Sequence, residues 1–183
     1  MSRVALLLAG FAVSLAVRVA VGGDGVARSW PAGLAFAACL LVLAVAAGTR
    51  MPVSRRAVLL GVAGAALVCL PVALQSLLTL RPLHGTDGFL SWALVVTVVA
   101  GAEEVFLRGA LYDAAVSAWS AGPAIVLGAV CFALLHVPLY GWHVVPLDLA
   151  VGVVLGGLRQ AAGTPAAPAV THVGADLVGW FVR

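Results

Sequence analysis

Charged residues are scarce in this chain of 183 residues. Asp, Glu, Lys and Arg together make up 9% of it, and none of the ten basic residues is a lysine. Hydrophobic residues account for 63% and the mean hydropathy is +1.16, against an apolar content of roughly 45–50% in soluble domains. No stretch is polar and long enough to form a soluble domain or a linker. The composition therefore excludes a soluble globular protein and predicts a polytopic membrane protein.

Several familiar motifs are absent as well. The cysteines Cys39, Cys69 and Cys131 all lie in apolar segments without a CxxC pair, which argues against a disulfide framework and against a zinc knuckle. No basic cluster with interleaved aromatic residues exists beyond Arg55 and Arg56, so the sequence gives no support to a nucleic-acid partner. GxSxG and HExxH are both missing, so neither the common serine-hydrolase motif nor the common zinc-protease motif is present.

What the sequence does have is a series of long apolar runs separated by short stretches with Gly, Pro, Arg and Asp. A helix needs about 20 residues to cross the hydrocarbon core. We therefore predict an all-α bundle of about seven transmembrane helices, in which the fourth is over-long and the sixth short. One integral-membrane domain covers residues 1–183, with a motif-free part over 1–88 and the polar motifs in 89–183. The runs lie near residues 4–22, 31–48, 57–80, 89–117, 122–139, 143–159 and 164–182.

The first run resembles a signal peptide in its basic start and apolar stretch. Because Arg18 breaks the end of that stretch and no A-x-A cleavage site follows, we expect a retained first helix. The arginine bias of the short loops favours a cytoplasmic N-terminus. We expect an integral protein of the bacterial plasma membrane, surrounded by lipid. The arginines compared are Arg3, Arg50, Arg55, Arg56 and Arg159 on the inside and Arg28, Arg81 and Arg183 on the outside.

Two adjacent glutamates and an arginine interrupt the fourth run, in the stretch AEEVFLR. Each such charge costs roughly 2.5–3.5 kcal/mol at the bilayer centre, so it indicates a functional site. Glu104 and Arg108 are four residues apart on one helix face and can form an ion pair. Glu103 lies about 100° away around the helix. If Glu104 holds Arg108, Glu103 remains available for chemistry.

Two later runs also carry ionisable side chains. His136 lies in FALLH, four residues after Phe132, and His172 lies four residues before Asp176 in HVGAD. A lone histidine on an apolar face is usually a satisfied interior residue, and an Asp four residues after a His is explained by a local hydrogen bond. Because polar groups in a membrane face the bundle interior, we nevertheless expect the three helices to bring these groups together.

The order EExxxR, FxxxH and HxxxD on successive helices resembles the CAAX protease and bacteriocin-processing family of intramembrane endopeptidases. The matching stretches are EEVFLR, FALLH and HVGAD, and the resemblance covers roughly residues 90–180. It implies hydrolysis of a peptide bond in a membrane-associated protein or peptide by a glutamate-activated water. By position, the resemblance implies that Glu103 is the general base and that His136 orients the water. It implies further that His172 with Asp176 stabilises the oxyanion. Glu104 with Arg108 would fix the geometry of the site.

Asp176 leaves the mechanism open, because family members often carry Asn at this position and an ionised Asp accepts hydrogen bonds without donating them. Asp176 is either protonated, or it accepts from His172 and fixes the tautomer of that ring. A third reading is a divalent metal such as zinc, for which Glu103, His136, His172 and Asp176 are an acceptable ligand set.

Two other function classes compete with the protease. A proton or ion transporter could use the same buried Glu, His and Asp groups as a relay, although transporters more often show repeats in matching halves. The alternative is a catalytically idle scaffold that kept the fold. Neither the identity of the substrate nor its prenylation follows from the sequence.

Overall fold

The computed structural model describes residues 2–79 and 85–182. Arg81 and Arg183, which were counted for the orientation, and residue 80 at the end of the third predicted run lie outside this part. The described residues form helices joined by short turns, and no strand occurs among them, which confirms the all-α prediction. The helices are α1 (Arg3–Gly22), α2 (Trp30–Ala46), α3 (Arg55–Leu78), α4 (Phe89–Glu104), α5 (Tyr112–Ala118), α6 (Ala121–Tyr140), α7 (Val145–Ala162) and α8 (Ala166–Val182).

The chain is an integral membrane protein. Within the described ranges, five helical stretches are long and apolar enough to cross a bilayer. The longest, Phe89–Ala118, has 30 residues and confirms that the fourth run is over-long. It is continuous because α4 and α5 are joined through a π-helical segment, η2 (Val105–Leu111). The helices α2 and α8 have 17 residues each and complete the bundle.

The sixth run is longer than predicted. It was expected over 143–159, whereas the structure has a helical stretch of 21 residues, Trp142–Ala162. The stretch begins with a 3₁₀ turn, η3 (Trp142–Val144), and continues to Gly163, whose φ of 72° ends the helix. The next helix begins correspondingly later, since the Thr164 side chain accepts a hydrogen bond from the Ala166 backbone N–H.

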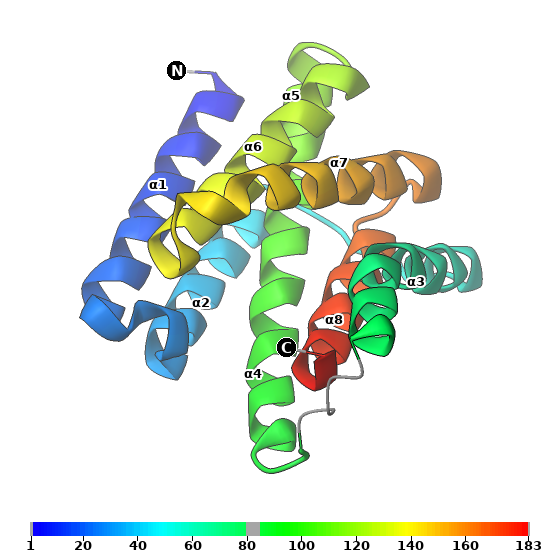
Figure 1. Cartoon of the computed structure of the whole chain (residues 1–183). Helices are drawn as coiled ribbons and strands as arrows, with labels where there is room; N and C mark the ends of the chain where they lie inside the picture. The colour runs from blue at the N-terminus through cyan, green and yellow to red at the C-terminus, as the bar shows by residue number, and fades with distance from the viewer. Residues whose placement is uncertain (1, 80–84, 183) are drawn as a thin grey trace.

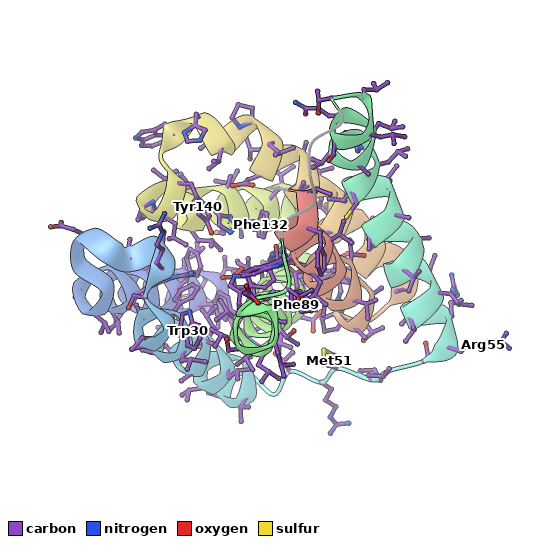
Figure 2. All side chains as sticks on the ribbon, turned by 60° about the horizontal axis from the view of Figure 1, so that its bottom comes forward. Trp30, Met51, Arg55, Phe89, Phe132 and Tyr140 are labelled. Atoms are coloured by element: carbon purple, nitrogen blue, oxygen red, sulfur yellow. The ribbon has the colours of Figure 1, made fainter. Side chains whose placement is uncertain are left out.

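The middle of the bundle is occupied by α4 (Figure 1). On one side it packs against α2, which lies beside α1, and on the other side against α8, which lies beside α3. Figure 2, in which α4 is seen nearly end-on, shows α1 and α2 on one side, α6 above, and α8 and α3 on the other side. Charges on α4 therefore face the interior of the protein rather than lipid.

Small residues permit a close contact between α6 and α7. A Cβ added to Gly152 would lie 2.7 Å from Ala129 Cα, and one added to Gly156 would lie 2.8 Å from Ile125 Cγ2. The spacing Gly152-xxx-Gly156 thus serves packing within one chain. Since α6 carries His136, this contact also fixes the position of that histidine relative to α7.

Candidate intramembrane active site

Glu104 lies at the centre of a fully buried polar cluster. Its side chain is 0% exposed. Arg108 Nη1 donates to Glu104 Oε1 at 2.8 Å, and Arg108 Nη2 donates to the Gly152 carbonyl oxygen at 3.2 Å. His172 Nδ1 lies 3.0 Å from the same Oε1. Because an ionised carboxylate can only accept, Nδ1 carries the proton in this contact. Glu104 therefore connects α4, η2 and α8, which fits the bracing role expected of it.

Glu103 has a different arginine. Arg18 of α1 donates from Nη1 to Glu103 Oε1 at 3.3 Å, and both side chains are buried. No hydrogen bond from a described residue reaches the second oxygen, Oε2. Each glutamate of the adjacent pair is thus neutralised by its own guanidinium, which reduces the cost of burying the charges.

His136 is oriented by its own helix and by α7. Its Nδ1 lies 3.0 Å from the Phe132 carbonyl oxygen and 3.3 Å from Asp148 Oδ2. The shorter contact takes the hydrogen bond, and Asp148 adds electrostatic attraction only, since its Oδ2 has no hydrogen-bond partner among the described residues. Both acceptors favour a proton on Nδ1. The neutral ring therefore presents Nε2 as an acceptor.

Asp176 lies beside His172, at 3.7 Å from Oδ2 to Nε2. This separation is too long for a direct hydrogen bond. The Phe132 ring packs edge-on against both histidine rings, with centroids 4.8 Å from His136 and 5.2 Å from His172, and the Arg108 guanidinium lies over it at 4.8 Å. Phe132 thus contacts both histidine rings and the Arg108 guanidinium.

A cavity of about 1200 Å³ opens beside these groups. It is lined by Glu103, His136, His172 and Asp176, whereas Glu104 and Arg108 do not line it. Its walls include apolar and aromatic residues of several helices, among them Trp30, Phe132 and Tyr140, which Figure 2 labels. The structure therefore brings the six residues predicted from the sequence into one region, with four at the cavity and two behind it.

The helix widens directly after the two glutamates. In η2 the backbone is π-helical, a rare geometry that often occurs at functional sites. Arg159 of α7 stabilises this segment, because its Nε donates to the Arg108 carbonyl oxygen at 2.7 Å and its Nη2 pairs with Asp113 Oδ1 at 2.7 Å. Its guanidinium also lies 4.8 Å from the centre of the Tyr112 ring. Arg159 thereby fixes the backbone that carries Arg108.

Residues 85–178 match a known protein family, described as type II CAAX prenyl endopeptidase Rce1-like. The matched range is slightly more than half of the 183 residues and includes α4 to α7 and most of α8. The chain belongs to this family. No curated protein and no solved structure matches the chain. The family agrees with the resemblance found in the sequence motifs.

All six predicted site residues of this Rce1-like protein lie within the matched range, whereas Arg18 lies outside it. The sequence alone indicated Arg18 only as an interruption of the first apolar run. An arginine four residues before the end of a helix is readily explained by its side chain reaching the interface, so the pattern gave no reason to pair it with Glu103. Its position facing α4 becomes evident only from the packing of α1.

The metal ligand set considered from the sequence is not assembled in the Rce1-like site. Among the residues that the structure describes, no three His, Cys, Asp or Glu side chains are grouped so that they could hold one ion. Two of the donor groups are each half engaged elsewhere, since Glu103 Oε1 pairs with Arg18 and the Nδ1 atom of His136 faces the Phe132 carbonyl. A cation at Glu103 would also be repelled by the adjacent guanidinium. The arrangement does not fit a bound metal.

Proposed function

We propose that this Rce1-like protein is an intramembrane endopeptidase in which Glu103 activates water for attack on a peptide carbonyl. The observation that carries the proposal is the position of Glu103: a buried carboxylate on α4 that lines a cavity of about 1200 Å³ together with both histidines. A buried charge of this kind indicates a functional group rather than a structural one. Membership of an endopeptidase family supports this activity over ion transport and over an idle scaffold.

The reaction needs one proton acceptor and one proton donor, and Glu103 can serve as both. Its free oxygen, Oε2, removes a proton from water while the water oxygen forms a bond to the carbonyl carbon. The carbonyl oxygen becomes an oxyanion. When the C–N bond breaks, the protonated Glu103 returns its proton to the leaving amine. The products are a carboxylic acid and an amine, and Glu103 is restored.

His136 is placed to hold the water. With Nδ1 protonated and facing the Phe132 carbonyl, the neutral ring offers the lone pair of Nε2, which can accept one hydrogen bond from a water in the cavity. The second proton of that water then remains for Glu103. This arrangement fixes both hydrogens of the nucleophile and leaves an oxygen lone pair for the attack.

The substrate that fits is a peptide segment of a membrane-associated protein. The cavity lies between helices of the bundle and more of its lining is apolar than polar, with Val95, Val96, Val99 and Leu147 among its residues. Such walls favour an apolar peptide or a lipid-modified one. The family description includes prenyl endopeptidases, so a peptide with a farnesylated cysteine near its C-terminus is the first probe to use.

The test is Glu103→Gln in protein purified into lipid nanodiscs and assayed with that farnesylated peptide and with the same peptide lacking the lipid. We expect cleavage to fall by at least a thousandfold because the amide cannot accept the proton, while the protein still purifies as a folded monodisperse species. Asp24→Asn is the matched control, since Asp24 is exposed and does not line the cavity. Full activity of Glu103→Gln would rule out the mechanism. The ratio of the two peptide rates measures the contribution of the lipid.

A further inference from the structure

The cavity brings several acidic side chains close to the proposed base. Three carboxylates line it, those of Glu103, Asp148 and Asp176. Among the described lining residues, the arginines are Arg18 and Arg28, and Arg28 is exposed. Attack on a peptide carbonyl adds a further negative charge at the substrate oxygen. In a site with little water such an oxyanion requires a donor or a cation that is already in position.

The side chain of Arg18 is held at this point. It is 7% exposed, its guanidinium carbon lies 4.9 Å from the centre of the Phe36 ring, and Nη1 contacts Glu103 Oε1. Its Nε is buried and has no hydrogen-bond partner among the described residues, and its Nη2 donates to none of them either. A guanidinium has five N–H donors in a fixed plane. Arg18 thus lines the cavity with donor capacity that the folded protein leaves unused.

The groups assigned to the oxyanion by resemblance are less suited to this role. The Nδ1 atom of His172 is already engaged by Glu104, so only Nε2 remains, and this atom faces the carboxylate of Asp176. An ionised Asp176 repels an oxyanion and cannot donate to it. Arg18, by contrast, contacts the carboxylate that would activate the water, so it lies near the carbon under attack.

We propose that Arg18 is a catalytic residue that stabilises the oxyanion of the tetrahedral intermediate. This inference rests on the proposed function of Glu103. Before the attack, the guanidinium is paired with the ionised Glu103. When Glu103 takes the proton it becomes neutral, and the negative charge appears on the substrate oxygen instead. The guanidinium therefore exchanges one anionic partner for another nearby, so the negative charge that moves from Glu103 to the substrate oxygen has a cation in position throughout the step.

The first test is a comparison of kcat and KM for Arg18→Met and Arg18→Lys with the wild type, using the farnesylated peptide. Loss of one oxyanion donor costs about a hundredfold to a thousandfold in kcat. We expect that loss for Arg18→Met, about a tenfold loss for Arg18→Lys, and KM within about threefold in both. Arg3→Met is the matched control on the same helix, because Arg3 donates to the Ala47 carbonyl and does not line the cavity.

The second test separates catalysis from folding. Arg18→Ala removes the guanidinium. Ethylguanidinium added to the assay should enter the cavity and raise the kcat of this variant at least tenfold. It should leave the Arg3→Met control unchanged. Arg18→Lys keeps a positive charge beside Glu103 and remains interpretable if the uncharged variants do not fold.

Three outcomes would overturn the assignment of Arg18: folded Arg18 variants with kcat close to that of the wild type, a rise in KM with unchanged kcat, or a folded Arg18→Ala protein that ethylguanidinium does not rescue. These are distinguishable from failure of the proposed function. Activity in Glu103→Gln contradicts the role of Glu103 itself. An inactive Glu103→Gln with fully active Arg18 variants contradicts only the role of Arg18.

Discussion

The Nδ1 atom of His172 lies 3.0 Å from Oε1 of Glu104, so α8 is joined to α4 through a buried hydrogen bond. Glu104, at the end of α4, also accepts a hydrogen bond from the Arg108 guanidinium, and it is therefore the common acceptor of α8 and the π-helical segment. The adjacent Glu103 faces the cavity instead. The two neighbouring carboxylates therefore have different surroundings: that of Glu104 lies among buried donors, and that of Glu103 lines the cavity.

The bracing role predicts a large stability effect for Glu104→Gln. The amide keeps the size of the side chain but leaves the Arg108 guanidinium buried without a countercharge. Removing one partner of a buried ion pair costs about 3–5 kcal/mol. We expect the free energy of unfolding to fall by this amount, as measured by thermal unfolding of the purified protein in detergent. The double variant Glu104→Gln/Arg108→Met removes both charges and should recover at least half of it. Unchanged unfolding of the single variant would contradict the role of Glu104.

Arg159 should support the site from a distance. Arg159→Met removes the donor to the Arg108 carbonyl and the partner of Asp113. A hydrogen bond from a charged group contributes about 1.5–3 kcal/mol. We expect stability to fall by about 2 kcal/mol and kcat by about tenfold, because the π-helical backbone that positions Arg108 is less constrained. Asp113→Asn is the comparison. Since half of the Asp113 side chain is exposed, its effect should stay below about 1 kcal/mol. Equal effects of the two variants would show that the surface ion pair, rather than the carbonyl contact, matters.

The contact between α6 and α7 gives a prediction with a control on the same helix. Gly152→Ala places a methyl group 2.7 Å from the Ala129 Cα atom, which is backbone and cannot rotate away. We expect destabilisation of about 1–3 kcal/mol from overpacking. A Cβ on Gly157 would meet no atom within 4 Å. Gly157→Ala should therefore be neutral, or stabilising by up to about 1 kcal/mol through helix propensity. Thermal unfolding of both variants checks the prediction. An unchanged free energy of unfolding in Gly152→Ala would mean that α7 can move away from α6.

Metal dependence is tested on the same preparation that serves the Glu103 assay. The guanidinium beside Glu103 and the dispersed donors predict a substoichiometric content of zinc and other divalent metals, and activity that persists after dialysis against EDTA. Elemental analysis and the peptide assay, run in parallel, measure both quantities. One bound metal per chain whose removal abolishes cleavage would require the donors to rearrange around it.

The sequence was most informative where charge interrupts an apolar run. Glu103, Glu104 and Arg108 were identified because isolated charge is costly in a membrane, and helical spacing alone gave the pairing of Glu104 with Arg108 that the structure shows. The same reasoning placed His136 and His172 on inward-facing helices. The all-α bundle and the long fourth helix follow from the length and composition of the runs.

Other features depend on packing between distant segments. Asp148 lies close to the start of a predicted span, where a charge needs no explanation, yet it approaches His136 to 3.3 Å. Arg159 was counted only as a loop charge, and its contact with the Arg108 carbonyl depends on how α7 crosses η2. The π-helical segment itself could not be predicted, because apolar spacing at 3.6 residues per turn gives no signal of a local change in helix type.

The pairing of Arg18 with Glu103 also has a consequence for biosynthesis. The two residues are 85 positions apart in the chain, and proteins are made from the N-terminus at about 5–20 residues per second. Arg18 therefore enters the membrane several seconds before its partner is synthesised, and its charge must be accommodated alone, by reaching toward the lipid headgroups. Only when α4 is inserted can the arginine turn inward. The pair of Arg18 and Glu103 thus forms only after α4 is inserted, and α6 and α8 bring His136 and His172 to it later still. A nascent chain that stops short of α4 holds this arginine without its countercharge.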